Sequence, residues 1–144
     1  MRFMLIRKVD PETEAGALPS EELISAMLQY NEEMMKAGVL LSGDGLRESS
    51  KGARIKFSGG KPAVIDGPFA ETKELIAGFT MIQVKSKEEA IEWVKRWPAI
   101  DGHGEVEIEI RQVFEAADFG AEFTPELQEQ EERLRVQIEA NTKR

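Results

Sequence analysis

The segment 66–74, DGPFAETKE, gathers four charged side chains around a glycine and a proline. Two interpretations of its first residue, Asp66, stay open. In the first, the segment is a chain-reversing turn: Asp66 caps backbone amides, Gly67 takes a special φ angle and Pro68 fixes its own. In the second, Asp66 ends a strand beside the mouth of a cleft. There it could act as a general base, or bind a cationic or hydroxyl group, if burial raised its pKa.

The second interpretation needs partners for this carboxylate, and two stretches of the chain offer them. Phe69, Glu71 and Lys73 follow directly in the same segment. Ser42 and Asp44 lie in the stretch LLSGDGL, whose glycines interrupt an expected strand and leave space above a sheet. We therefore expect a ligand-binding site built from these five side chains around the carboxylate.

Other catalytic patterns are absent from the sequence. It contains no G-x-G-x-x-G after a strand, no Walker loop, no H-E-x-x-H and no G-x-S-x-G. The single histidine, His103, stands between two glycines, which favours a solvent-exposed loop residue over a catalytic one. A metal site of His103 with Asp101 and Glu105 would lack a firm third ligand on a rigid element. We expect no metal and no cofactor.

Bulk composition narrows the class of protein. A chain of 144 residues suits one domain, and 41% hydrophobic with 32% charged residues is ordinary for a soluble globular protein. The net charge of −8 disfavours nucleic acid and anionic membranes as partners. There is no cysteine, and no segment approaches the length of a signal peptide core or a membrane span. These features predict a cytoplasmic protein.

Hydrophobic periodicity and capping signals divide the chain into strands and helices. In the first strand Phe3 and Leu5 alternate with Met4 and Ile6, so both of its faces are apolar. The sequence predicts strands over 2–9, 39–46, 75–84 and 105–114, helices over 20–37 and 86–97, and a hairpin over 53–66. Gly59-Gly60 supplies the tight turn of the hairpin, which we expect to be half exposed because basic and apolar residues alternate along it.

This order of elements predicts an α+β protein, a ferredoxin-like plait of two split βαβ halves with an antiparallel sheet and an inserted β-hairpin. Such a plait covers one face of its sheet with helices. Because two strands are apolar on both faces, the second face needs a cover. A second copy of the chain would give a homodimer of the dimeric α+β barrel kind. The competing cover is the tail from 119 to 144, where we expect a helix after Thr124; residues 1–118 form the main domain.

Four stretches in order, AGVLLSGDGL, SSKGARIKFSGGKPAVIDGPFAETKELIAGF, KSKEEAIEWVKRWP and EVEIEIRQVFE, strongly resemble the YCII-related family, in its branch marked by the DGPF motif. The resemblance covers about residues 1 to 120. It implies a dimeric α+β barrel. It also implies an enzymatic pair in a cleft, of which the aspartate maps to Asp66. The histidine of that pair belongs on the first helix, where the window 26–30 has none. Either Tyr30 or a carboxylate such as Glu33 replaces it, or the chemistry of the pair is absent from this chain.

Three classes of function follow from these observations. The first is a small-molecule-binding homodimer with a cleft around Asp66 and a regulatory role. Resemblance alone links the DGPF branch with alternative sigma factors, which supports that role. The second is a small enzyme with Asp66 as general acid or base. The third is a structural interaction module.

Overall fold

The computed structural model describes residues 1–142 and divides the chain into two compact units. The first unit spans Met1–Val113, and the second begins at Phe114. The domain boundary that we expected after residue 118 stays a prediction. No helix among the described residues is long and apolar enough to cross a membrane.

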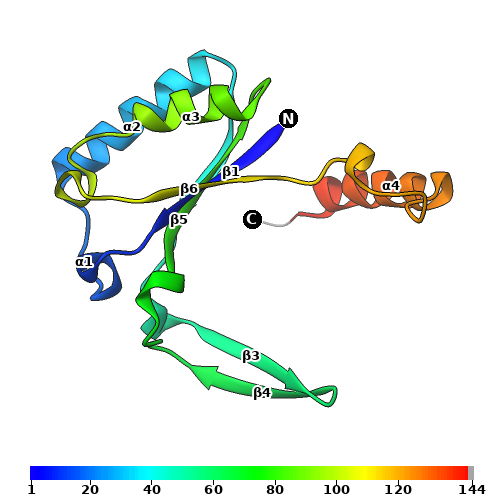
Figure 1. The fold of residues 1–144 in the computed structure, drawn as a ribbon, viewed down its shortest axis with the longest axis horizontal. Coiled ribbons are helices and arrows are strands. Elements are labelled where there is room, and N and C mark those ends of the chain that lie inside the picture. Colours follow the sequence, from blue (N-terminus) through cyan, green and yellow to red (C-terminus); the bar gives the residue numbers. More distant parts are fainter. Residues whose placement is uncertain (143–144) are drawn as a thin grey trace. The chain divides into compact units, whose positions relative to one another are not determined.

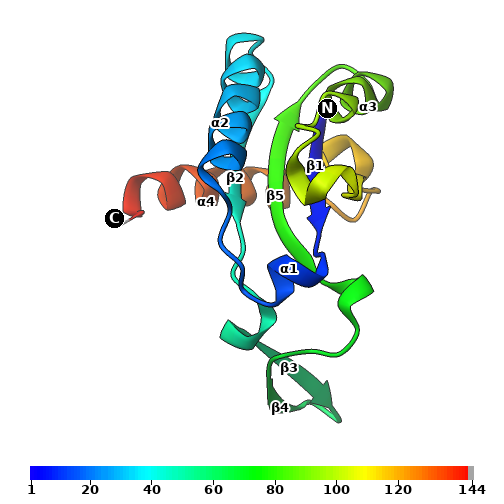
Figure 2. The same ribbon diagram turned by 90° about the vertical axis from the view of Figure 1, so that its left-hand side faces the viewer.

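The first unit is built on a four-stranded antiparallel sheet with the order β2-β5-β1-β6 (Figure 1). In this sheet β1 (Arg2–Lys8) and β5 (Ile76–Gln83) form the centre, and β2 (Leu40–Gly45) and β6 (Ile108–Gln112) form the edges. The long helices α2 (Glu21–Lys36) and α3 (Lys87–Lys95) lie on one side of it (Figures 1 and 2). This mixed α+β arrangement is compatible with the ferredoxin-like plait expected from the order of elements.

Both long helices begin at the serine caps that the sequence indicates. The Ser20 hydroxyl accepts a hydrogen bond from the Leu23 amide, and the Ser86 hydroxyl accepts one from the Glu89 amide. After α2, Gly38 adopts a φ of 76°, the left-handed conformation that ends helices and suits glycine. The sequence prediction missed one short helix, α1 (Pro11–Glu14), which Asp10 caps.

The two faces of the sheet differ in how far they are covered. Residues that face the helices are buried with α2 and α3 in one core, which contains Phe3, Leu5, Tyr30, Met34, Val39, Ile82, Val84 and Ala90. On the other face, which we call the outer face, strand pairing places Met4 opposite Met81 and Ile6 opposite Phe79. All four of these side chains are only partly buried. The apolar second face predicted from the sequence is therefore present and incompletely covered.

Strands β3 (Ala53–Ser58) and β4 (Lys61–Asp66) form a separate two-stranded antiparallel sheet, which we call the ribbon (Figure 1). Gly59 and Gly60 have φ angles of 57° and 78° at its tip, as the predicted tight turn requires. Ile55, Phe57, Val64 and Ile65 are all exposed. The expectation of a half-exposed hairpin is thus wrong in detail, because these apolar side chains are exposed too.

The second unit contains a short helical turn, η4 (Ala116–Asp118), and the helix α4 (Pro125–Asn141). The Thr124 hydroxyl accepts a hydrogen bond from the Leu127 amide and so begins α4. Phe119 stacks on Phe114 at 4.9 Å between ring centroids and lies 5.0 Å from Phe123. No residue of α4 is buried.

Candidate functional site

Asp66 is the last residue of β4 and pairs with Ala53 of β3. It is exposed, and within residues 1–142 its carboxylate makes no hydrogen bond or ion pair. The interpretation of Asp66 as a cap for backbone amides is therefore wrong. Asp66 also lacks the burial on which its interpretation as a general base depends.

Gly67 has a different reason to be glycine from the one that the sequence indicates. Its φ is not in the positive region, so no special backbone angle requires glycine here. A Cβ atom at this position would lie 1.8 Å from the Ser49 carbonyl oxygen and 2.6 Å from the Ser49 carbonyl carbon. The Gly67 amide donates to the Gly52 carbonyl at 3.1 Å. Close approach of two backbone segments thus explains the glycine.

The segment that follows Asp66 is held by a chain of hydrogen bonds to two other elements. The Phe69 amide donates to the Ser49 hydroxyl at 3.0 Å, in the short helix η1 (Ser49–Lys51). That hydroxyl in turn donates to one oxygen of the Glu14 carboxylate in α1, and the Ser49 amide donates to the other at 2.8 Å. These hydrogen bonds join the segment 66–74 to η1 and α1, and we call this contact region the junction.

Arg54 of β3 holds the same segment from its other side. Its guanidinium lies 4.0 Å from the centroid of the Phe69 ring, within cation–π distance. Two carboxylates lie near this guanidinium, Glu71 at 3.8 Å and Glu74 at 3.9 Å. Both pairs are long and exposed, so they orient the arginine more than they stabilise the fold. Lys73 of the helical turn η2 (Thr72–Glu74) is exposed.

A small depression opens beside this junction. Val9, Pro11 and Ala15 supply its apolar lining, and the polar lining residues are Asp10, Glu14 and Thr72. The Asp10 carboxylate accepts hydrogen bonds from the Thr13 amide and from the Arg7 guanidinium. Burial alone would raise the pKa of Asp10, but these hydrogen bonds outweigh it and hold the pKa below its usual value. Asp10 is therefore ionised at neutral pH, and a carboxylate oxygen can accept more than one hydrogen bond.

The remaining predicted site residues lie elsewhere. Ser42 and Asp44 are exposed on β2, opposite Met81 and Phe79 on the outer face. Tyr30 is buried in the core, where its hydroxyl donates to the Trp93 carbonyl at 2.6 Å. Burial raises the pKa of Tyr30 to about 12. The structure thus brings Phe69 and Glu71 together around Arg54, but not Asp66, and gives Tyr30 a core role.

Sequence analysis missed a buried ion pair. Arg7 binds Asp101 through two hydrogen bonds, of 2.7 and 3.1 Å, and the Trp97 indole donates to the same carboxylate at 2.8 Å. Burial would raise the pKa of Asp101, but these donors outweigh it and hold the pKa below its usual value. The only signal in the sequence is an arginine in an apolar strand. Because Asp101 is committed in this way, it is not free to ligate a metal with His103.

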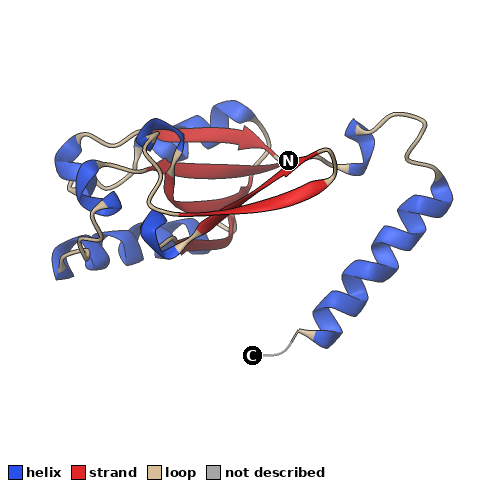
Figure 3. Ribbon diagram, turned by 90° about the horizontal axis from the view of Figure 1, so that it is seen from below, coloured by secondary structure: helices blue, strands red, loops and turns tan. Residues whose placement is uncertain are grey.

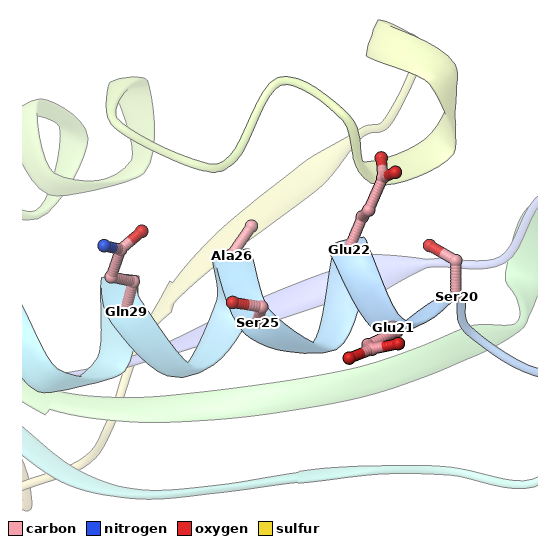
Figure 4. Close-up of a pocket in the computed structure, with 6 residues that line it drawn as sticks. All are labelled: Ser20, Glu21, Glu22, Ser25, Ala26 and Gln29. Atoms are coloured by element: carbon pink, nitrogen blue, oxygen red, sulfur yellow. The ribbon is translucent and has the colours of Figure 1, made fainter.

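The other charged clusters do not form a site. His103 is exposed and lies 3.2 Å from a Glu12 oxygen, which agrees with a solvent-exposed loop residue. Among the described residues, no group of three or more His, Cys, Asp and Glu side chains is placed to hold a metal ion. A second, shallow depression lies along the start of α2, where Figure 4 shows Glu22, Ala26 and Gln29 pointing to the same side of the helix. It is open and belongs to a single helix.

A comparison with known protein families identifies the family of this chain. The model of the YCII-related domain matches residues 1–116. The chain belongs to the YCII-related domain family. Its assignment to the DGPF branch remains a prediction from the motif.

Two other proteins are similar to this chain. An uncharacterised protein of Rhizobium meliloti (strain 1021) is 32% identical over 75 residues, which is 52% of this chain and 60% of that protein. The chain thus matches less than two thirds of the length of this relative. A solved structure, 5-chloro-2-hydroxyhydroquinone dehydrochlorinase (TftG) of Burkholderia phenoliruptrix AC1100 in complex with 2,5-dihydroxybenzoquinone, is 16% identical. It has a TM-score of 0.46, with 79% of this chain and 94% of that chain covered.

Proposed function

We propose that this YCII-related protein is a homodimer that binds a small organic molecule beside the segment 66–74. The observation that carries the proposal is the junction itself. Gly67 is pressed against the η1 backbone, and Phe69 is fixed by Ser49 and Arg54. A solvent-exposed turn does not need such restraint, whereas a binding site requires side chains held in place.

The lining of the nearby depression suggests the chemistry of the ligand. Asp10 and Glu14 present carboxyl groups, Thr72 presents a hydroxyl, and the remaining lining residues are apolar. Carboxylates accept hydrogen bonds and attract cations. A neutral or cationic molecule with hydroxyl or amino donors on a compact apolar frame fits this lining. Glu71 and Lys73 flank Thr72 in the chain.

The outer face of the sheet supports the homodimer. Its centre is apolar and partly exposed, and its edges carry both signs of charge: Asp44 on β2, and Glu109 and Arg111 on β6. A two-fold pairing of this surface with itself joins apolar centres and can place acids against bases. In such a dimer Ser42 and Asp44, on an edge strand of the paired face, would lie at the interface. We leave Tyr30 out of the site because its hydroxyl is already bound to Trp93.

An enzyme that uses Asp66 as general acid or base is the second candidate. It requires a ligand or a partner chain to exclude water from a carboxylate that is exposed here. The regulatory role, with its link to an alternative sigma factor, and the cytoplasmic location stay predictions from the sequence.

A thermal-shift screen of small hydroxylated and amino compounds tests the binding site. Thr72→Val removes the hydroxyl while keeping the shape of the side chain, and we expect it to weaken a hit about 10-fold, the loss of one hydrogen bond. Ser25→Ala, on the surface of α2, is the control. Equal affinity of the two variants for every hit would contradict a ligand site at this depression.

A further inference from the structure

The ribbon has two chemically different faces. Residues directly opposite in an antiparallel pair share a face, and the register pairs Ile55 with Val64 and Phe57 with Pro62. One face is therefore apolar, and Asp66 lies on it at the base of the ribbon, opposite Ala53. The other face carries the three cations of the ribbon, Arg54, Lys56 and Lys61.

The apolar face is bare in a single chain. Ile55 is 59% exposed, Phe57 67% and Val64 68%. Two-stranded hairpins are marginally stable in water unless a hydrophobic face packs on something. At the base of the ribbon, Arg54 on the basic face packs on Phe69, so the apolar face is the one left for another partner.

Charge and direction favour a second copy of this chain as that partner. The ribbon holds three cations and one carboxylate, whereas the whole chain has a net charge of −8, so the remainder of another copy attracts it. The ribbon also projects to the side of the sheet that lies away from α2 and α3 (Figures 1 and 3). That is the side of the partly exposed outer face, so one two-fold pairing can cover both apolar surfaces.

The area that a dimer interface must bury also favours a contribution from the ribbon. A stable dimer buries about 800 Å² on each partner, and more in obligate dimers. Four partly buried side chains at the centre of the outer face offer little of that area. The ribbon adds three largely exposed apolar side chains on a projecting arm.

We propose that the ribbon is a dimerisation arm whose apolar face packs on a second copy of the chain. The arm also covers the base of the ribbon, so Asp66 leaves water only in the dimer and the site is complete only there. This inference rests on the homodimer of the proposed function, and names the segment that makes it.

Sedimentation velocity over a dilution series tests the arm in the full chain. We expect Phe57→Ser combined with Val64→Ser to raise the dimer dissociation constant by about 100-fold or more, because each dimer loses four apolar contacts. Leu28→Ser is the matched control: Leu28 is 63% exposed, but on α2. Unchanged circular dichroism shows that the variants fold, which we expect because the ribbon contributes no residue to the core.

Two further variants separate the alternatives. Met81→Lys places a charge at the centre of the outer face. If it dissociates the dimer while the ribbon variant does not, the arm is refuted and the homodimer stands. If Leu134→Ser with Ile138→Ser dissociates the dimer while the ribbon variant does not, α4 makes the interface and the arm is refuted. A monomeric wild-type chain at micromolar concentration refutes both the arm and the homodimer.

Discussion

Replacement of Gly67 by alanine tests whether the segment 66–74 is held in place by close contact with the Ser49 backbone. The added Cβ would lie 1.8 Å from the Ser49 carbonyl oxygen, where real contacts exceed 3 Å, and 3.2 Å from the Ser50 amide nitrogen. These are backbone atoms, so the two segments must move apart by more than 1 Å, as an order-of-magnitude estimate. That movement breaks the hydrogen bonds from Gly67 to Gly52 and from Phe69 to Ser49.

The expected cost follows from these losses. Each of the two hydrogen bonds contributes about 1 kcal/mol, and residual crowding adds about 1–2 kcal/mol, so we expect Gly67→Ala to lower the free energy of unfolding by about 3–4 kcal/mol. Urea unfolding followed by the fluorescence of Trp93 and Trp97, which pack against the core, measures it.

Gly52→Ala is the matched control in the same junction. Its Cβ would meet the Ser49 carbonyl oxygen at 3.7 Å, an ordinary contact. We expect a change within about 0.5 kcal/mol. Gly67→Ala as stable as the wild type, or equal losses in the two variants, would refute the role of close approach.

Three further substitutions have definite expected outcomes. Asp101→Asn leaves Arg7 buried without its partner and should cost about 3–5 kcal/mol at pH 7. Because the folded pKa of Asp101 is lowered, its stabilisation is present above the unfolded pKa and is lost as pH falls, so urea melts should show this difference shrinking below about pH 4. Tyr30→Phe removes one of the two donors to the Trp93 carbonyl, which still accepts from the Arg96 amide, and should cost about 0.5–1.5 kcal/mol. The single tyrosine of the wild type should titrate in ultraviolet absorbance with a pKa of about 12. Asp66→Asn should change the free energy of unfolding by less than about 0.5 kcal/mol, because the carboxylate is exposed; a larger loss in the melt would mean that it has a bonded partner.

Periodicity and capping residues were enough to predict the central elements. The alternation of Phe3 and Leu5 with Met4 and Ile6 corresponds to the core face and outer face of β1. Ser20 and Ser86 mark the helix starts. These signals are local, because a cap or a strand period depends on residues within one turn or one strand.

The junction could not be predicted, because it depends on contacts between distant segments. Nothing near Gly67 in the sequence indicates that the Ser49 backbone presses against it, and the sequence suggested a φ requirement instead. The pairing of Arg7 with Asp101 joins residues 94 positions apart. Tyr30 was expected near a ligand because it lies on the first helix, but its position on the helix turns it into the core.

The register of the ribbon allows its length to change by deletion or insertion of cross-strand pairs. Ala53 and Asp66 are cross-strand partners, so residues removed in matched pairs near the tip leave both ends of the ribbon in place. Removing one cross-strand pair would place the turn next to a pair on the opposite face of the ribbon. Removing two pairs leaves the turn next to a pair on the same face as before. The reach of the ribbon therefore changes in steps of about 7 Å with its apolar side preserved. Chains with a shorter or longer ribbon of the same parity can present the same surface at a different distance from Asp66.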